Sequence, residues 1–384
     1  MSDLSPQLPV SSYFDAELYQ RELQTLFQSG PRYVGHALSV PCVGDYFALP
    51  HEGEGRALVH TAQGVELLSN VCRHRQAVIL KGKGSLNTTG GHVVCPIHRW
   101  TYEGAGGQSL DDLPNLPNLP VGTLIGAPHF ADTPCLPLNN YRLQEWKGLL
   151  FEDGLSGGPG SGRNIAADLA NMSVSTEFDF EGFVLDKVEL HECKYNWKTF
   201  IEVYLEDYHV GPFHPGLSSF VTCDDLQWEF RDPYSVQTVG VSGAFGRPGS
   251  PVYQRWYDAL QKYRNGKTPE RGAIWLTYYP HIMVEWYPHV LVVSTLHPIS
   301  LDRTLNKVEF YYPEEIHAFE REFVESQQAA YMETCIEDDE IGERMDAGRK
   351  ALLDRGDNEV GPYQHPMEDG MQHFHQWYRR QMAL

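Results

Sequence analysis

Two short pairs of cysteine and histidine constrain this chain more than any other feature of its sequence. Cys72-Arg-His74 is followed, after 20 intervening residues, by Cys95-Pro-Ile-His98. Each pair offers one thiolate sulfur and one imidazole nitrogen, and both groups bind metals. The order of the ligands indicates two hairpin loops, each of which contributes one ligand of either kind to a shared centre.

This ligand set is that of a Rieske [2Fe-2S] cluster, in which two cysteines hold one iron and two histidines hold the other. A structural zinc site with two cysteines and two histidines is the alternative, and it would make a colourless protein. Zinc sites usually group like ligands, as Cys-x-x-Cys and His-x-x-His. Because each pair here mixes the two types, the pattern favours the Rieske cluster.

The residues around the second pair suit a tight loop that is shielded by aromatic side chains. Gly90-Gly91 precedes it, and Trp100 and Tyr102 follow it. The stretch from about Tyr33 to Glu152 resembles the Rieske domain of ring-hydroxylating oxygenases, with Cys72, His74, Cys95 and His98 on that family's ligand motif. The pairs lie farther apart than is usual in the family, and we interpret the excess, Lys81 to Gly91, as a longer hairpin tip.

Length and charge limit what the rest of the chain can do. The 384 residues are enough for two domains with cores of their own. The formal net charge of −21, from 30 basic and 51 acidic residues, opposes binding to nucleic acid or to an anionic membrane. We find no secretory segment and no apolar run that could span a bilayer, and the scattered, odd-numbered cysteines predict a cytoplasmic protein.

A second motif lies between Asn196 and His214. The stretch before Gly211-Pro212 contains no helix breaker, so we predict a helix that places Glu202, Glu206 and His209 within reach of one face. Gly211-Pro212 should end that helix, and His214 should then come from the turn beyond it. Two histidines beside carboxylates at a helix break predict a metal site, and zinc remains open on this motif alone.

A third ligand is predicted in the acidic run Glu337-Asp338-Asp339-Glu340. On a helix, Asp338 lies in register with the apolar Tyr331, Cys335 and Ile341, whereas Asp339 lies on another side. An acid on an apolar stripe needs a partner, and a metal ion would serve. We therefore predict that His209, His214 and Asp338 form a 2-His-1-carboxylate site for non-haem Fe(II), with Asp339 as the fallback ligand.

This half of the chain resembles the catalytic domain of the Rieske oxygenase α subunit. In that family an acid three residues before the first histidine bridges the iron site to a Rieske histidine of the neighbouring subunit in a head-to-tail homotrimer. Glu206 holds that position here, where many members have Asp. The resemblance also implies a separate NAD(P)H-dependent reductase or ferredoxin as electron donor, O2 as co-substrate, and hydroxylation or oxidative demethylation of a small organic molecule.

Two points stay open at this stage. A Rieske electron-transfer protein without oxygenase activity is the alternative function, although it would not need His209, His214 and Asp338. The substrate is either an aromatic compound or a quaternary amine. A fixed Arg or Lys in the pocket would favour an aromatic carboxylate, and a ring of aromatic residues would favour a quaternary ammonium group. Candidates for such a ring are Tyr204, Tyr208, Phe213, Phe220 and Trp228.

The predicted fold is α+β: an N-terminal all-β Rieske domain, then a catalytic domain with an antiparallel sheet packed by long helices. We place the N-terminal helix, which packs on the catalytic domain, at 1–32, the Rieske domain at 33–153, a Gly-rich linker at 154–163 and the mononuclear iron domain at 164–384. We interpret the His373-Phe-His375 piece as helix surface and interface rather than as a metal site. The predicted strands of the catalytic domain are 184–192, 235–241, 273–279, 282–286, 290–297 and 308–312, and its predicted helices are 313–355 and 371–382.

Overall fold

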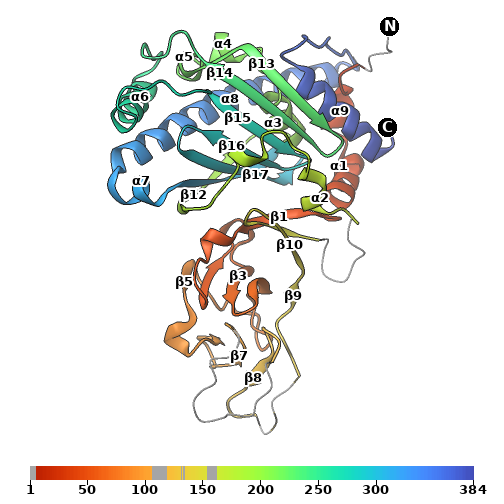
Figure 1. Cartoon of the computed structure of the whole chain (residues 1–384). Helices are drawn as coiled ribbons and strands as arrows, with labels where there is room; N and C mark the ends of the chain where they lie inside the picture. The colour runs from red at the N-terminus through yellow and green to blue at the C-terminus, as the bar shows by residue number, and fades with distance from the viewer. Residues whose placement is uncertain (1–5, 106–118, 131, 133–134, 154–161) are drawn as a thin grey trace. The chain divides into compact units, whose positions relative to one another are not determined.

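The computed structural model describes residues 6–105, 119–130, 132, 135–153 and 162–384. The chain divides into two compact units (Figure 1). Each unit has hydrophobic core clusters of its own. One unit is Ser29–Asp168, and the other joins the segment that ends at Gln28 to Leu169–Leu384. Most of the linker predicted at 154–163 lies outside the described residues.

The smaller unit consists of short antiparallel strands. Its three sheets have the orders β1-β11-β10, β5-β2-β3-β4-β9 and β6-β7-β8. The strands of the three sheets, in that order, are β1 (Arg32–His36), β11 (Leu149–Glu152), β10 (Leu143–Trp146); β5 (Lys83–Ser85), β2 (Asp45–Ala48), β3 (Arg56–Thr61), β4 (Gly64–Ser69), β9 (Asn140–Tyr141); β6 (Val93–Val94), β7 (Thr101–Tyr102), β8 (Leu124–Gly126). Short helical segments are η3 (Ala37–Ser39), η4 (Pro50–Glu52), η5 (Leu86–Thr89) and α2 (Ile165–Leu169).

The stretch from Lys81 to Gly91 is not simply the hairpin tip that we predicted. Its first half is β5, which pairs with β2 so that Ser85 lies opposite Asp45. The Ser85 hydroxyl then accepts a hydrogen bond from the Asn87 amide and caps the turn η5. The polar composition concealed an edge strand, because a strand with one open edge needs few apolar residues.

The larger unit contains one seven-stranded antiparallel sheet of order β12-β18-β17-β16-β15-β14-β13. All six predicted strands are present. Val221–Arg231 was missed, because Asp224-Asp225 interrupts its apolar pattern. The strands are β12 (Phe183–Cys193), β13 (Val221–Arg231), β14 (Tyr234–Val241), β15 (Ala273–Tyr278), β16 (Ile282–Tyr287), β17 (Val290–Ser300) and β18 (Arg303–Pro313).

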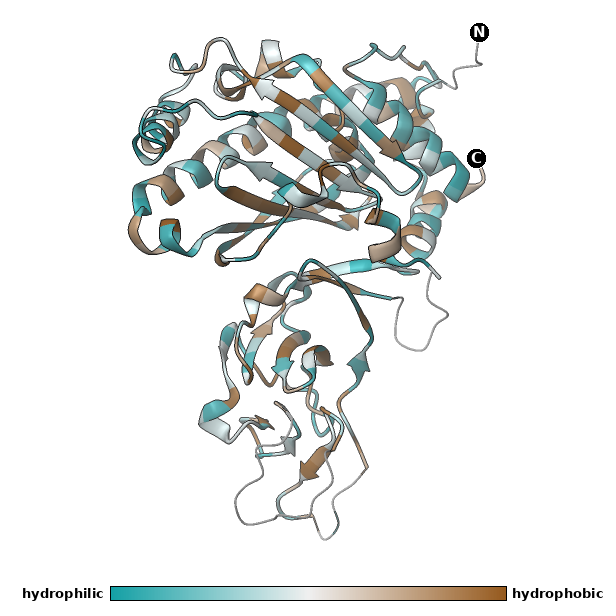
Figure 2. Cartoon of the chain, in the orientation of Figure 1, coloured by the Kyte–Doolittle hydropathy of each residue, from teal (hydrophilic) through white to brown (hydrophobic). Residues whose placement is uncertain are grey.

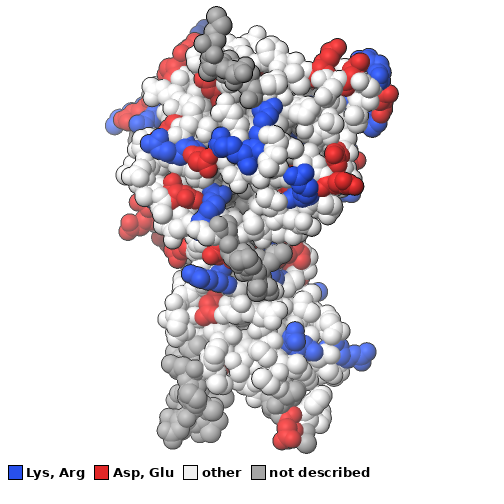
Figure 3. All heavy atoms as spheres, turned by 90° about the vertical axis from the view of Figure 1, so that its right-hand side faces the viewer, with Lys and Arg blue, Asp and Glu red and all other residues white. Residues whose placement is uncertain are grey.

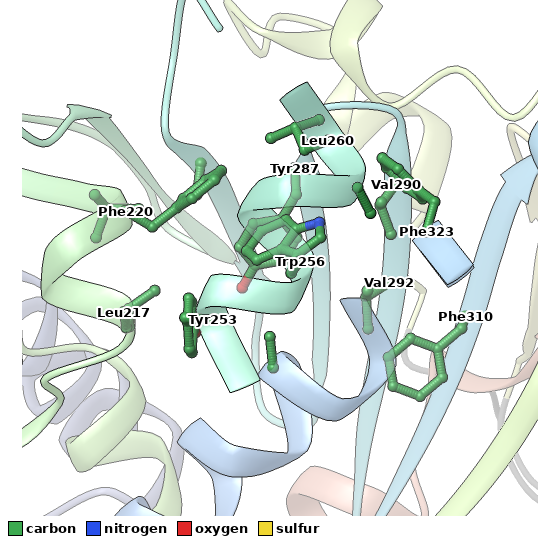
Figure 4. Packing of buried hydrophobic residues seen from close by; sticks show 14 of the residues in the cluster. Leu217, Phe220, Tyr253, Trp256, Leu260, Tyr287, Val290, Val292, Phe310 and Phe323 are labelled. Atoms are coloured by element: carbon green, nitrogen blue, oxygen red, sulfur yellow. The ribbon is translucent and has the colours of Figure 1, made fainter. Parts of the chain in front are cut away.

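Two groups of helices pack on one face of this sheet and form two separate hydrophobic clusters with it. Val290, Val292 and Leu296 lie an even number of residues apart on β17, so they share a face. The two valines pack with α6 and α8, and Leu296 packs with α3, α9 and the N-terminal segment. Figure 2 shows apolar residues along the strands, and Figure 4 shows Trp256 of α6 beside Tyr287 of β16. The helices of this unit are η1 (Val10–Tyr13), α1 (Ala16–Glu22), η2 (Leu23–Phe27), η6 (Ser175–Glu177), α3 (Trp197–Tyr204), α4 (Val210–Phe213), α5 (Leu217–Phe220), α6 (Pro251–Tyr263), α7 (Glu314–Phe319), α8 (Arg321–Asp354) and α9 (Asp369–Met382).

The helix predicted over 313–355 is divided in two. Glu320 leaves the helical region of the backbone, with φ −117° and ψ 57°, and separates α7 from α8. The sequence carries no proline or glycine at this point, so the break was not predictable from local composition. The remainder, α8, is continuous through the acidic run.

A buried carboxylate fixes the N-terminal segment within the larger unit. Glu22 accepts hydrogen bonds from Trp197 Nε1 at 2.9 Å, from Lys198 Nζ at 2.7 Å and from the Tyr378 hydroxyl. Because a buried charge is costly without a partner, the Lys198 ammonium and Glu22 compensate each other. The segment therefore forms part of the core that holds α3 and α9.

Our interpretation of His375 as helix surface is wrong. This residue is buried, and its ring contacts Glu202 through Nε2 at 2.7 Å and the Tyr363 hydroxyl through Nδ1 at 2.7 Å. Glu202 is also paired with Arg349.

No helix among the described residues is long and apolar enough to cross a membrane. On the face drawn in Figure 3, basic side chains lie among acidic ones.

Candidate active site

The two Cys and His pairs lie in loops of matching backbone geometry. The Cys72 amide donates to the Ala77 carbonyl at 2.8 Å, and the Cys95 amide donates to the Trp100 carbonyl at 2.8 Å. In each loop, the residue four positions after the cysteine has a positive φ and donates back to the cysteine carbonyl. Backbone pairing closes the base of each loop. Val71 pairs with Val78 at the first loop, and β6 pairs with β7 at the second.

The four predicted ligands line one pocket together with Arg75, Ala77 and Ile97. The imidazole rings of His74 and His98 lie 4.7 Å apart between centroids. His74 Nδ1 is buried and has no hydrogen-bond partner among the described residues, as expected of a nitrogen that binds a metal. The indole of Trp100 stacks on His74, with centroids 4.9 Å apart.

The pocket suits a cluster better than a single ion. Within the described part of the chain, two groups of three or more ligand side chains have their atoms within 4.8 Å of one another, and neither group includes any of these four residues. Tetrahedral zinc would require them closer together. The Tyr102 hydroxyl lies 3.4 Å from Cys72 Sγ, and such contacts to sulfur tune the potential of a Rieske centre.

The helix predicted to carry Glu202, Glu206 and His209 ends earlier than expected. α3 ends at Tyr204, and His209 immediately precedes a separate short helix, α4, that contains Gly211-Pro212. Pro212 is tolerated near the start of α4 because amides in the first helical turn have no partner within the helix. Glu202, on α3, points into the core, whereas Glu206 lies in the loop beside His209.

His209, His214 and Asp338 converge on one point. Asp338 Oδ1 lies 3.0 Å from His214 Nε2 and 3.5 Å from His209 Nε2, and the two imidazole centroids are 4.9 Å apart. Asp338 Oδ1 is buried, yet it has no hydrogen-bond partner of normal geometry within the described residues. Two nitrogens and one oxygen that face a common centre, without bonding one another, fit the ligand set of a mononuclear metal ion.

A second carboxylate stands behind each histidine. Glu206 contacts His209 Nδ1, and Glu337 contacts His214 Nδ1 at 2.7 Å. A carboxylate can only accept, so Nδ1 carries the proton and Nε2 presents its lone pair toward Asp338. Burial lowers the pKa of His209, but the neighbouring carboxylates of Asp338 and Glu206 outweigh it and raise that pKa to about 10, because they favour a positive charge between them. The site therefore favours a bound cation.

Asp339, the fallback ligand, lies elsewhere. Its carboxylate contacts His191 Nε2 at 2.8 Å and the Tyr195 hydroxyl at 3.0 Å. The helical phase separated the two neighbouring acids correctly, because consecutive residues on a helix point about 100° apart.

A pocket opens beside the three converging side chains, between the end of α3, α6, α8 and the strands β15 and β16. Among its described lining residues there is no lysine or arginine, whereas four carboxylates are present: Glu206, Asp207, Glu285 and Asp338. Its walls are aromatic or apolar to a large extent. The lining residues beyond the two histidines and the four carboxylates are Phe200, Val203, Tyr204, Val210, Leu217, Tyr253, Trp256, Trp275, Tyr287, Gln327, Tyr331, Thr334 and Cys335.

The aromatic ring proposed from the sequence is wrong in most of its members. Of the five candidates, Tyr204 alone lines this pocket; Tyr208 is 60% exposed and Phe220 packs in the core. Sequence reasoning missed Glu285, Asp207 and the aromatic residues of α6 and β16. A signal for Glu285 was available, because it is the single charged residue in the apolar strand Ile282–Tyr287.

Comparison with known proteins matches two parts of the chain to two known domains. Residues 31–123 match the Rieske [2Fe-2S] domain, and residues 179–384 match the catalytic domain of the ring hydroxylating alpha subunit. The chain belongs to the Rieske ring-hydroxylating oxygenases. It is accordingly an oxidoreductase that uses a Rieske [2Fe-2S] cluster, a mononuclear iron and O2.

Particular relatives are similar over nearly the whole chain. A putrescine 2-hydroxylase of Ralstonia nicotianae is 61% identical over 98% of this chain and 95% of its own length. A putrescine 2-hydroxylase of Bordetella bronchiseptica is 59% identical over 98% of this chain and 85% of its own length. The crystal structure of the quaternary ammonium Rieske monooxygenase CntA with L-carnitine has the same fold, with a TM-score of 0.70, 18% identity and coverage of 99% and 96% of the two chains.

Proposed function

We propose that this protein is the terminal oxygenase of a multicomponent system and that it hydroxylates a carbon atom of a small primary diamine, with putrescine as the candidate. The charge of the pocket carries this proposal. Once Asp338 and Glu206 are assigned to the iron site, Glu285 and Asp207 remain as two further carboxylates, without a lysine or arginine among the described lining residues. The two relatives that are 61% and 59% identical hydroxylate putrescine.

The same charges weigh against the two substrate classes considered from the sequence. An aromatic carboxylate would meet like charges in this pocket and no lysine or arginine among its described lining residues to balance them. A quaternary ammonium group suits aromatic walls, but it has no N–H to donate to Glu285 or Asp207. A primary ammonium group donates three hydrogen bonds, and a diamine carries two positive charges.

The residues that would hold the two metal centres follow from the geometry. Cys72, His74, Cys95 and His98 would hold the cluster, and His209, His214 and Asp338 would hold Fe(II). When bound, the two centres supply electrons and the open iron positions at which O2 is activated. The contribution of the polypeptide is to fix the ligands through Glu206 and Glu337, to enclose the substrate within aromatic walls and to orient it by charge.

Glu206 is proposed to have a second role, as the bridge to a Rieske histidine of a neighbouring subunit in a homotrimer. It is only partly buried, with 15% of its side chain exposed, and it already contacts His209 Nδ1. A carboxylate oxygen has two lone pairs, so Glu206 can accept from a further imidazole N–H. An NAD(P)H-dependent reductase or ferredoxin is the expected electron donor.

The test is turnover of the purified, iron-loaded protein with a Rieske oxygenase reductase, NADH and O2. We expect putrescine to yield a monohydroxylated diamine whose added oxygen comes from labelled O2. L-carnitine and benzoate serve as representatives of the other substrate classes. The His209→Ala variant is the matched control, because it should keep the Rieske spectrum and form no product. Oxygenation of carnitine or benzoate, but not of putrescine, would refute the diamine proposal.

A further inference from the structure

Glu285 is a buried carboxylate that the iron site does not use. It lies in the middle of β16, where its cross-strand neighbours are Trp275 and Val292. Cross-strand neighbours share a face of the sheet, so Glu285 points to the helix-covered side, between Met283 and Tyr287. It is 1% exposed and lines the pocket beside the three converging iron ligands.

Tyrosine hydroxyls hold both oxygens of this carboxylate. Tyr331 donates to Oε1 at 2.6 Å, and Tyr287 donates to Oε2 at 2.8 Å. The Tyr287 hydroxyl in turn accepts a hydrogen bond from Trp275 Nε1 at 3.0 Å, which fixes its direction. The two carboxylate oxygens have four lone pairs between them, so Glu285 can accept from a further donor even with three tyrosine hydroxyls around it.

No positively charged group compensates Glu285 among the described residues around it. The largest influences on its pKa are burial, the hydroxyls of Tyr331, Tyr287 and Tyr204, and the carboxylate of Asp338. Burial accordingly raises the pKa of Glu285 to about 7, although the tyrosine hydrogen bonds oppose the shift. An ionised carboxylate in such a place requires a cation as partner, and the pocket is where one can arrive.

Tyr204 connects this carboxylate to the second one. Glu285 and Asp207 both raise the pKa of Tyr204, and its buried hydroxyl faces Glu285 without a hydrogen bond of normal geometry within the described residues. Asp207 is 3% exposed; its Oδ1 accepts from Gln237 Nε2 at 3.3 Å, and its Oδ2 has no partner there. The pocket thus offers two separate anionic positions with an unpaired hydroxyl near both.

We propose that Glu285, held by Tyr287 and Tyr331, is the subsite that binds one ammonium group of the diamine and sets the preference for a diamine over a monoamine. This inference rests on the proposed function and deepens it. A monoamine bound at Asp207 would leave Glu285 buried without its partner, which is a penalty that a diamine avoids. If Glu285 anchors one ammonium group, its position in the pocket should also select the chain length of the substrate.

The first test compares wild type with Glu285→Gln on putrescine and on butylamine, using iron-loaded protein. For putrescine we expect kcat/KM to fall, and the anaerobic Kd to rise, by about 100-fold, the scale of a lost buried ion pair. For butylamine we expect kcat/KM to rise, because the neutral amide removes the penalty of an unpartnered carboxylate, so the preference for the diamine is lost. Iron content and the Rieske spectrum establish that the variant is folded and loaded.

The second test uses Glu285→Asp, which keeps the charge and withdraws it by one methylene. The preference should move from putrescine toward 1,5-diaminopentane, whose chain is one methylene longer, by about 10-fold in the ratio of kcat/KM values. A merely structural carboxylate would not change the chain-length preference. This readout stands alone if Glu285→Gln fails to load iron, and an unchanged ratio would overturn the inference.

The outcomes separate the two proposals. If wild type hydroxylates putrescine but Glu285→Gln binds and hydroxylates it equally well, the subsite is wrong and the proposed function stands. If wild type neither binds nor hydroxylates putrescine, the proposed function fails and the inference fails with it.

Discussion

At the scale of single residues, the proposed iron site depends on groups that do not themselves face the point on which its three ligands converge. His209 and His214 each turn Nδ1 to a carboxylate, Glu206 and Glu337 respectively. These contacts fix which nitrogen faces Asp338. Groups that hydrogen-bond to a metal ligand in this way contribute roughly 10- to 100-fold in metal affinity. The two carboxylates therefore form a natural pair for comparison.

Glu337→Gln and Glu206→Gln are expected to differ in one measurable respect. Both substitutions weaken a histidine's support, so both should reduce bound iron, by about 10-fold in affinity. If Glu206 also bridges to a neighbouring subunit, its loss should in addition reduce product formed per bound iron, whereas Glu337→Gln should leave that ratio near the wild-type value. Iron content and single-turnover product yield measure the two effects, and equal yields per iron would count against the bridge.

At the scale of secondary-structure elements, α8 is the support of the site. It contributes Tyr331, Thr334, Cys335 and Asp338 to one pocket, and Asp346 on the same helix accepts a hydrogen bond from the Asn196 amide at 2.8 Å. Gly342 lies one turn beyond Asp338, and a Cβ there would come within 2.8 Å of the Tyr195 ring. The close approach of the helix to Tyr195 thus needs a glycine.

Two helical glycines give a matched test of this contact. Gly348, on the same helix, lies where an added methyl group would meet open space. Gly348→Ala should raise the free energy of unfolding by up to about 1 kcal/mol through helix propensity. Gly342→Ala gains the same helix propensity, but its methyl group overlaps Tyr195. The free energy of unfolding of Gly342→Ala should therefore be about 1–3 kcal/mol lower than that of Gly348→Ala, and the variant should bind less iron. Denaturant unfolding of both variants checks this, and equal stabilities would contradict it.

At the scale of the whole molecule, the buried pocket carboxylates reduce the stability of the fold in the absence of substrate. Glu285 has its pKa raised by burial to about 7, from an ordinary value of 4.5. Between these two pH values the folded state holds a proton that the unfolded state releases. The stability of the free protein therefore falls as pH rises through this window, and the full cost is present above pH 7.

Glu285→Gln should remove this contribution to the pH dependence. We compare the free energy of unfolding of the variant with that of wild type, both without diamine. As the pH rises from 4.5 to 8, this difference should shift in favour of the variant by on the order of 3 kcal/mol. Tyr204, Tyr287, Tyr331 and Asp338 face the same position and are common to both proteins. Chemical unfolding at a series of pH values measures the difference, and a difference independent of pH would show that Glu285 keeps one protonation state throughout.

Much of this protein was determined by sequence patterns that act locally. The pairs Cys72-Arg-His74 and Cys95-Pro-Ile-His98 have a spacing that two matching loops satisfy, and the alternation of apolar residues predicted six of the seven strands of the larger sheet. Asp338 was separated from Asp339 by helical phase, which is a property of the helix alone. Such features follow from backbone geometry over a few residues.

The tertiary structure decided what depends on distant segments meeting. The end of α3 before Glu206 coincides with hydrogen bonds from the Met371 amide to the Leu205 carbonyl and from the Asp207 amide to the Met367 carbonyl. The core position of His375 likewise depends on Glu202, far away in sequence. The pocket is the clearest case, because β16 supplies Glu285, α8 supplies Tyr331 and the loop after α3 supplies Asp207. The charge that a substrate meets is a sum over these segments, and only the folded chain brings their carboxylates together.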